Sequence, residues 1–112
     1  MKIKKTMKSK NYVLIDNCEL VRVTWNYSAK LKGIKLSTYD SVEAFINDQE
    51  KLPKTSSIYI DYHLGQDQNG ITESIKIAEL GFTNIFLCTG SQLNIDLPPR
   101  IKGRVGKMPV FN

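Results

Sequence analysis

Four apolar stretches in this chain are each followed by polar side chains that could take part in chemistry. The residues that follow them are Asp16 with Asn17, Asp61 with Tyr62 and His63, Thr89 with Gly90 and Ser91, and Lys107. Asp61 is the most informative of these, because it ends the run SIYI and an ionised carboxylate is costly to bury without water or a cation nearby. If the stretches are parallel strands, their carboxyl ends bring two acids, an amide, a hydroxyl and an amine to the edge of the sheet where ligands collect.

Strands must therefore position these residues. Apolar runs occupy 12–15, 57–60 and 84–88, with a weaker run at 103–108 and a more polar one at 33–39. The runs are rich in Ile, Val, Tyr and Phe and do not alternate strictly, which is typical of parallel strands covered on both faces.

Helical patterns fill the gaps between the runs. Segment 19–32 is predicted to be a helix that ends at Gly33. Its predicted buried side holds Leu20, Thr24, Tyr27 and Leu31, which recur at helical spacing. Alternating strands and helices predict a doubly wound α/β sheet with right-handed crossovers.

Two further helices are predicted, and the pattern then weakens. Segment 40–53 begins with Asp40 and Glu43 at capping-box spacing and ends at Pro53. The apolar sides are Val42, Phe45 and Ile46 in this helix, and Ile71, Ile75 and Ala78 in a helix at 70–81. Beyond Gly90 the prolines at 98 and 99 allow at most a short helix and an irregular loop.

Length and charge predict one domain with a basic tail. The 112 residues fit a single core, which we place at residues 11–112. Residues 1–10 hold five of the 16 Lys and Arg, so the other 11 balance the 11 acids and the excess charge lies in the tail. A solvated tail is the preferred interpretation over one that binds nucleic acid or anionic lipid.

Composition excludes several classes of function. No stretch is long and apolar enough to cross a bilayer, and no apolar segment of a secretion signal follows the basic start, so we expect a cytoplasmic protein without a membrane partner. Cys18 and Cys88 lack a CxxC pattern and suit reduced, partly buried thiols. The single histidine argues against a zinc site, and no glycine-rich phosphate motif follows the first apolar run.

The ordered set of motifs resembles the receiver domains of response regulators. YVLIDNCELVR looks like their first strand with its acids, IYIDYHL resembles the phosphoacceptor strand, IFLCTG the strand that ends in a hydroxyl and a small residue, and GKMP the lysine–proline end of the fifth strand. The resemblance runs from about Asn11 to Pro109, and the LGQDQNG loop looks most like receivers attached to hybrid sensor kinases. It implies a flavodoxin-like, five-stranded parallel sheet of strand order 2-1-3-4-5 that lacks the family's C-terminal helix.

The resemblance also implies a role for each polar residue. Asp61 would take a phosphoryl group from a phosphohistidine of a histidine kinase or a histidine phosphotransfer protein. Thr89 and Gly90 would adjoin that group, and Lys107, preferred over Lys102, would pair with Asp61 and then with the phosphoryl group. Mg²⁺ would be held by Asp16, Asn17, Asp61 and the backbone carbonyl of His63. Such a protein is not an enzyme in the ordinary sense, since it catalyses at most its own phosphorylation and dephosphorylation.

Three departures from the family pattern favour an alternative function. Asn17 stands where the family has a second acid, Arg104 stands at the aromatic switch position, and the family's last helix is missing after Lys107. As a separate departure, Pro109 comes one residue later after Lys107 than in the family, where this proline aims the lysine. The alternative is a pseudo-receiver that acts through protein contacts without phosphorylation. Asp61, Thr89 and Lys107 favour the phosphoacceptor, although strand-end acids also commonly cap the next helix and Thr89 could be an ordinary strand residue.

The missing last helix predicts an interaction surface. Only MPVFN follows Lys107, so apolar sheet surface beside the first helix should be bare, with Trp25 and Tyr27 covering part of it. Large bare apolar patches usually bind a partner. We therefore expect a homodimer or a docking partner on that face.

Overall fold

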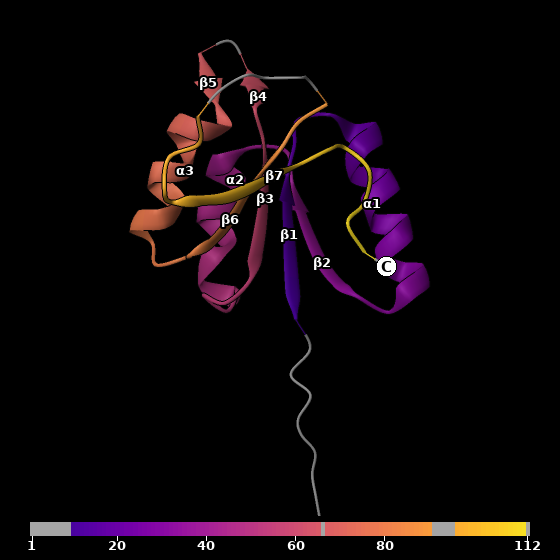
Figure 1. The fold of residues 1–112 in the computed structure, drawn as a ribbon. Coiled ribbons are helices and arrows are strands. Elements are labelled where there is room, and N and C mark those ends of the chain that lie inside the picture. Colours follow the sequence, from indigo (N-terminus) through magenta and orange to yellow (C-terminus); the bar gives the residue numbers. More distant parts are fainter. Residues whose placement is uncertain (1–9, 66, 91–95, 112) are drawn as a thin grey trace, which may run out of the picture.

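The structure is a computed structural model that describes residues 10–65, 67–90 and 96–111. Its main sheet is parallel and has the strand order β2-β1-β3-β6-β7 (Figure 1). The strands are β1 (Asn11–Ile15), β2 (Lys35–Tyr39), β3 (Ser57–Asp61), β6 (Asn84–Cys88) and β7 (Ile101–Val105). Because β4 (His63–Gly65) and β5 (Gln68–Asn69) form a separate two-stranded ribbon, β6 and β7 are the fourth and fifth strands of the main sheet, and the predicted order 2-1-3-4-5 is confirmed.

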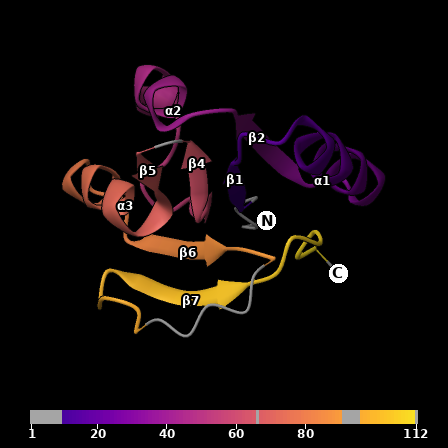
Figure 2. The same ribbon diagram turned by 90° about the horizontal axis from the view of Figure 1, so that it is seen from above.

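Helices cover both faces of the sheet unequally. Figure 2 shows α1 (Glu19–Lys32) on one face, with α2 (Val42–Asp48) and α3 (Gly70–Glu79) on the other. A 3-10 turn at Gln49–Lys51 extends α2. Two buried clusters result, one between the sheet and α2 with α3, and a smaller, aromatic one beneath α1. Within the described residues, no helix is long and apolar enough to cross a membrane.

The prediction for the buried side of α1 was wrong. Leu20, Tyr27 and Leu31 are exposed, and the helix instead buries Trp25 and Ala29 against the sheet. Trp25 is fully buried and contacts the rings of Tyr59 and Phe111. Burying an indole removes a large apolar area from water, which favours packing of the Trp25 side against the sheet. The side with Leu20, Tyr27 and Leu31 therefore faces solvent.

Local signals at the helix ends were partly correct. Gly33 ends α1 in the left-handed conformation at φ 67°, as predicted. The N-cap of α2 is Ser41 rather than Asp40, because the Ser41 hydroxyl accepts a hydrogen bond from the Ala44 amide. In α3 the fully buried apolar side chain is Ile77, and Ile75, which was predicted to be buried, is exposed.

The chain beyond β7 continues as an irregular segment without a helix up to residue 111. Within residues 96–111 no helix is present, and the segment after β7 places Phe111 against Trp25 and Tyr12. Phe111 is buried there. The predicted bare face is thus covered in part by Trp25 and Phe111, whereas Tyr27 points to solvent. The predicted short helix after Gly90 falls largely on 91–95, outside the described residues, as does most of the basic tail.

Candidate functional site

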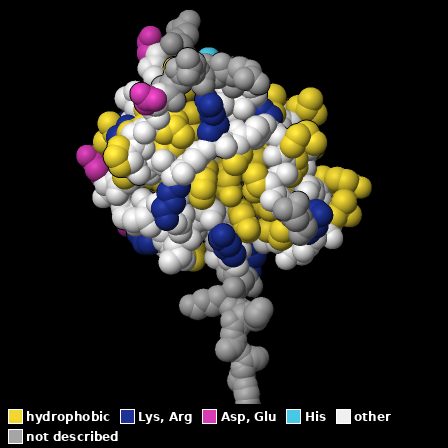
Figure 3. All heavy atoms as spheres, in the orientation of Figure 1, with side chains coloured by type: hydrophobic (Ala, Val, Ile, Leu, Met, Phe, Trp, Pro, Cys, Tyr) yellow, Lys and Arg dark blue, Asp and Glu magenta, His cyan; other side chains and the backbone are white. Residues whose placement is uncertain are grey.

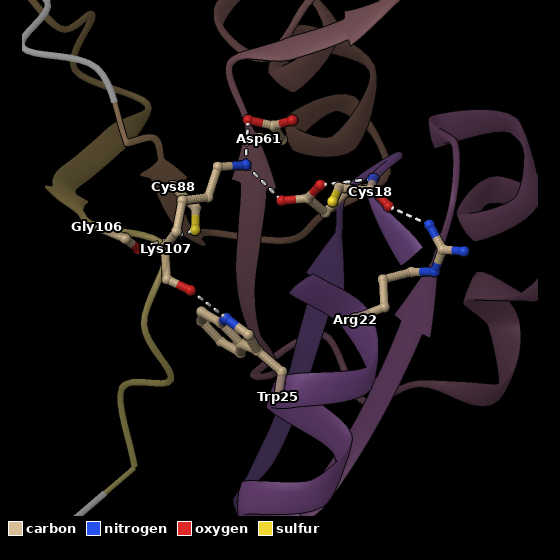
Figure 4. A network of polar contacts seen from close by, with 8 residues as sticks. Cys18, Arg22, Trp25, Asp61, Cys88, Gly106 and Lys107 are labelled. Carbon is tan, nitrogen blue, oxygen red and sulfur yellow. Dashed lines mark hydrogen bonds and ion pairs between the residues drawn. The ribbon is translucent and has the colours of Figure 1, made fainter. Parts of the chain in front are cut away.

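Lys107 joins two carboxylates that come from separate strands. Its Nζ lies 2.6 Å from Oδ2 of Asp16 and 2.7 Å from Oδ1 of Asp61 (Figure 4). Asp16 follows β1, Asp61 ends β3, and Lys107 comes two residues after β7. Because the strands are parallel, all three residues lie at the edge of the sheet formed by the carboxyl ends of the strands, which we call the rim. Lys102, the alternative to Lys107, instead donates a hydrogen bond to Asn84. The structure therefore brings together these three predicted site residues.

The burial of this cluster disfavours the charged form of its acids. Asp16 is 0% exposed and Asp61 3% exposed. Burial raises the pKa of Asp61, and the neighbouring charge of Asp16 adds to the rise, which the hydrogen bond from Lys107 only partly offsets. Burial lowers the pKa of Lys107, but its hydrogen bonds to Asp16 and Asp61 outweigh burial, so the net shift is upward. The lysine is a charged partner that holds two acids close together.

Asp16 is held from three directions. One carboxylate oxygen, Oδ1, accepts a hydrogen bond from the backbone amide of Cys18 at 2.9 Å. Arg22 donates from its guanidinium to the Asp16 carbonyl at 2.7 Å. With Oδ1 and the backbone fixed by the start of α1, Oδ2 is presented to Lys107. Cys18 itself is exposed, unlike the partly buried thiol that was predicted.

The backbone around Lys107 is held by two donors that were not predicted. The indole Nε1 of Trp25 donates to the carbonyl of Lys107 at 2.8 Å (Figure 4). The thiol of Cys88 donates to the carbonyl of Gly106 at 3.1 Å, and burial raises the pKa of this thiol to about 12, so that it stays protonated. A buried indole N–H needs an acceptor, which is the one signal in the sequence that could have suggested a polar role for Trp25.

A tight ribbon follows Asp61. β4 (His63–Gly65) pairs with β5 (Gln68–Asn69), and the amide of Gly70 then donates to the Tyr62 carbonyl at 2.9 Å. A Cβ on Gly70 would lie 2.4 Å from the carbonyl oxygen of Asp61, so only glycine fits there. A backbone hydrogen bond from His63 reaches the Asp61 carboxylate and lowers its pKa slightly against the effect of burial. This ribbon brings α3 close to the acid.

Thr89 and Gly90 lie on the same rim. Thr89 directly follows Cys88, the register partner of Asp61, and its amide donates to the Val105 carbonyl at 3.0 Å. Its side chain is buried. A Cβ on Gly90 would lie 3.3 Å from Cγ of Lys107, so the small residue leaves room for the lysine chain. Ser91 lies outside the described residues.

Comparison with solved structures identifies the fold. The receiver domain of the TMAO respiratory system response regulator TorR matches with a TM-score of 0.72 at 19% identity, over 88% of this chain and 83% of that one. FixJ-N matches with a TM-score of 0.71 at 18% identity, over 95% and 86%. The N-terminal domain of a response regulator/sensory box/GGDEF 3-domain protein from Carboxydothermus hydrogenoformans matches at 0.71 and 15% identity, over 88% and 82%. This chain has the receiver fold.

Sequence comparison adds nothing to this assignment. No protein-family model matches the chain, and no curated protein matches it either. The receiver fold is therefore established by backbone geometry at low sequence identity.

The rim of this receiver fold has the donor chemistry that Mg²⁺ prefers, with fewer charges than a dedicated metal site. Asp16 and Asp61 offer carboxylate oxygens, and Asn17 is an exposed amide next to Asp16. Among residues 10–65, 67–90 and 96–111, no three His, Cys, Asp or Glu side chains group to hold a metal. Mg²⁺ needs few protein ligands and keeps several waters, so two acids and an amide fit it. His63, whose backbone carbonyl was predicted to be a ligand, is exposed and is the strand-register partner of Asn69 in the β4–β5 ribbon.

Proposed function

We propose that this receiver fold accepts a phosphoryl group on Asp61 from a phosphohistidine in a two-component phosphorelay. The observation that supports this most is the ion-pair bridge of Lys107 to both Asp16 and Asp61 at the carboxyl ends of the strands. In the proposed step, a P–O bond forms to an Asp61 carboxylate oxygen as the P–N bond to the histidine breaks, and the electron pair leaves with the imidazole. Phosphoryl transfer asks mainly for positioning and charge neutralisation.

The proposal gives each rim residue a task. Lys107, now shared between two acids, would turn to the new phosphoryl oxygens. Thr89 would donate its hydroxyl to a phosphoryl oxygen, and Gly90 would leave access. Asp16, Asn17, Asp61 and the His63 carbonyl would hold Mg²⁺, which when bound neutralises the charge of the transferred group. The partner would be a histidine kinase or a histidine phosphotransfer protein.

The decisive test uses a small-molecule phosphodonor. The chain is incubated with acetyl phosphate and Mg²⁺, and intact mass is measured for an acid-stable, base-labile gain of one phosphoryl group. The gain should vanish in Asp61→Asn and persist in Asp67→Asn, which removes an exposed acid of the adjacent loop. Beryllofluoride with Mg²⁺ should change the fluorescence of Trp25, whose indole binds the Lys107 backbone. No mass gain with any donor would contradict the proposal.

A pseudo-receiver is the second candidate, and one observation favours it. Asn17, next to Asp16, adds an amide without charge. The rim therefore has two negative charges, Asp16 and Asp61, of which Lys107 already balances one. This balance lowers the attraction for a divalent cation. The variant Asn17→Asp separates the two candidates, because a weak phosphoacceptor should gain Mg²⁺ affinity and phosphorylation, whereas a chain that works by contacts alone should stay unmodified in both forms.

The sheet face beneath the C-terminal segment is a proposed partner surface. We define the sheet face as Tyr12, Phe86 and Val105, which remain half-buried although Phe111 covers part of this side. Figure 3 shows hydrophobic side chains gathered at the centre of this view, between basic residues. A homodimer or a docking partner on this face remains the proposal made from the sequence.

A further inference from the structure

A second apolar surface lies on α1, away from the sheet. Four large apolar side chains of this helix are exposed, namely Leu20 at 72%, Val23 at 54%, Tyr27 at 66% and Leu31 at 69%. We call these four residues the α1 stripe. They point away from Trp25 and Ala29, which hold the helix to the sheet. Figure 3 shows hydrophobic side chains over α1 at the right of the molecule.

The spacing of the α1 stripe is that of a helix–helix seam. Leu20, Thr24, Tyr27 and Leu31 follow one another at intervals of four, three and four residues. Apolar residues at this spacing form the contact line between paired helices. Thr24 is not one of the four stripe residues but lies between them on the helix surface, and its hydroxyl already donates to the Leu20 carbonyl at 2.8 Å, so that it adds little polar cost to the seam.

The charges beside the seam select a second copy of the same helix, running antiparallel. Glu19 lies in the first turn of α1 and Lys30 in the last turn, eleven residues apart and hence on the same flank of the helix. In a parallel two-fold pair, this flank would face the opposite flank of the second helix, which carries Lys32 and no acid, so Lys30 would lie near a like charge and Glu19 would have no lysine at its level. In an antiparallel pair related by a two-fold axis, each Glu19 faces the Lys30 of the partner subunit, and the helix dipoles also oppose one another.

We propose that two copies of this chain associate through the α1 stripe as an antiparallel, two-fold symmetric helix pair. Leu20 then lies against Leu31 of the partner subunit, and Tyr27 lies near the axis. A two-fold contact is self-complementary and closes on itself, so the α1 contact by itself joins two copies and no more. The 14-residue helix is about 21 Å long, and an interface of that length belongs to the small, weak class.

Concentration-dependent mass of the full chain tests the proposal. Sedimentation equilibrium from micromolar to millimolar chain should show a monomer–dimer equilibrium. Leu31→Lys should raise the dissociation constant about tenfold or more, with an unchanged circular dichroism spectrum because Leu31 is exposed. A mass that stays monomeric at every concentration would overturn the proposal, and it would leave the stripe to a partner of another kind.

A charge swap tests the antiparallel arrangement itself. Glu19→Lys alone and Lys30→Glu alone should each raise the dissociation constant about fivefold, since symmetry changes two facing pairs at once. The double variant Glu19→Lys with Lys30→Glu should restore dimerisation, and higher salt should reduce all these differences. The matched control is Phe86→Lys on the sheet face. A dimer that is lost in this control and insensitive to the α1 changes would overturn the proposal.

Discussion

Asp61 is a buried acid whose ionisation opposes folding. Its pKa is raised because burial and the nearby charge of Asp16 outweigh the pairing with Lys107. The folded chain therefore holds the Asp61 proton more tightly than the unfolded chain does. The contribution of this group to stability is largest below the unfolded pKa of 3.8 and is lost as the pH rises through the higher folded pKa.

Asp61→Asn should consequently stabilise the fold at neutral pH. The amide carries no charge to bury, and Lys107 keeps its ion pair with Asp16. We expect a melting temperature a few degrees higher than that of the wild type at pH 7, and a difference that shrinks as the pH falls toward 3.8. Thermal melts across this range measure it. Asp67→Asn, at an exposed position, should show no such trend. A lower melting temperature for Asp61→Asn at pH 7 would contradict the sign.

Trp25 positions the backbone of Lys107 through its indole N–H. Trp25→Phe keeps a buried ring and removes the N–H that binds the Lys107 carbonyl. The fold should lose about 1–2 kcal/mol, because a part-buried carbonyl is left without its donor. The pKa of Lys107, now raised, should move back toward 10.5 as the lysine loses its fixed place between the acids.

Two measurements separate this positioning role from simple packing. Urea unfolding gives the stability change, and NMR titration of the lysine ammonium gives the pKa. Tyr27→Phe, on the exposed side of the same helix, is the matched control and should change neither. A Trp25→Phe variant that loses stability but keeps the Lys107 pKa would reduce Trp25 to a packing residue.

At the scale of elements, the β4–β5 ribbon depends on one glycine. Gly70→Ala would place a Cβ 2.4 Å from the Asp61 carbonyl oxygen and 3.0 Å from Leu87, so the end of β3 and the start of α3 must separate. Overpacking of this kind costs about 1–3 kcal/mol. Gly106→Ala is the control, since a Cβ there meets nothing within 4 Å. Urea unfolding of both variants compares them, and equal stabilities would contradict the close approach.

The elements also show what could be predicted from the sequence and what could not. Apolar runs that end in acids predict parallel strands and their common rim, because a strand covered on both faces has few alternatives. The orientation of α1 was not predictable in the same way, since Leu20 and Leu31 mark one side and Trp25 and Ala29 the other. The side that packs is the one whose side chains fit the sheet, where Trp25 contacts Tyr59. The hydrogen bond from the Trp25 indole to the Lys107 carbonyl joins residues that are 82 positions apart, and no local sequence pattern predicts it.

The whole molecule is asymmetric in how its two sheet faces are closed. One face has two helices, and the other has α1 and the irregular segment after β7 that includes Phe111 (Figure 2). Phe111 meets Trp25 with ring centroids 5.5 Å apart and Tyr12 at 5.0 Å, both edge-on. The segment therefore ties the last strand to α1 and β1, and it also carries Lys107 into the rim. The same segment thus covers part of this face and places Lys107 at the site.

Phe111→Ala should therefore weaken the fold and the site together. Removing a buried aromatic ring costs about 3–5 kcal/mol where the surroundings cannot collapse, and somewhat less is expected here because Phe111 sits at the edge of its cluster. The sheet face should also become more accessible, which binding of a hydrophobic dye would report. Met108→Ala, in the same segment but 75% exposed, is the control and should change stability little. If Phe111→Ala unfolds at the same urea concentration as the wild type, the segment does not close this face, and the contacts with Trp25, Cys88 and the two acids are enough to hold residues 106–107 in the rim.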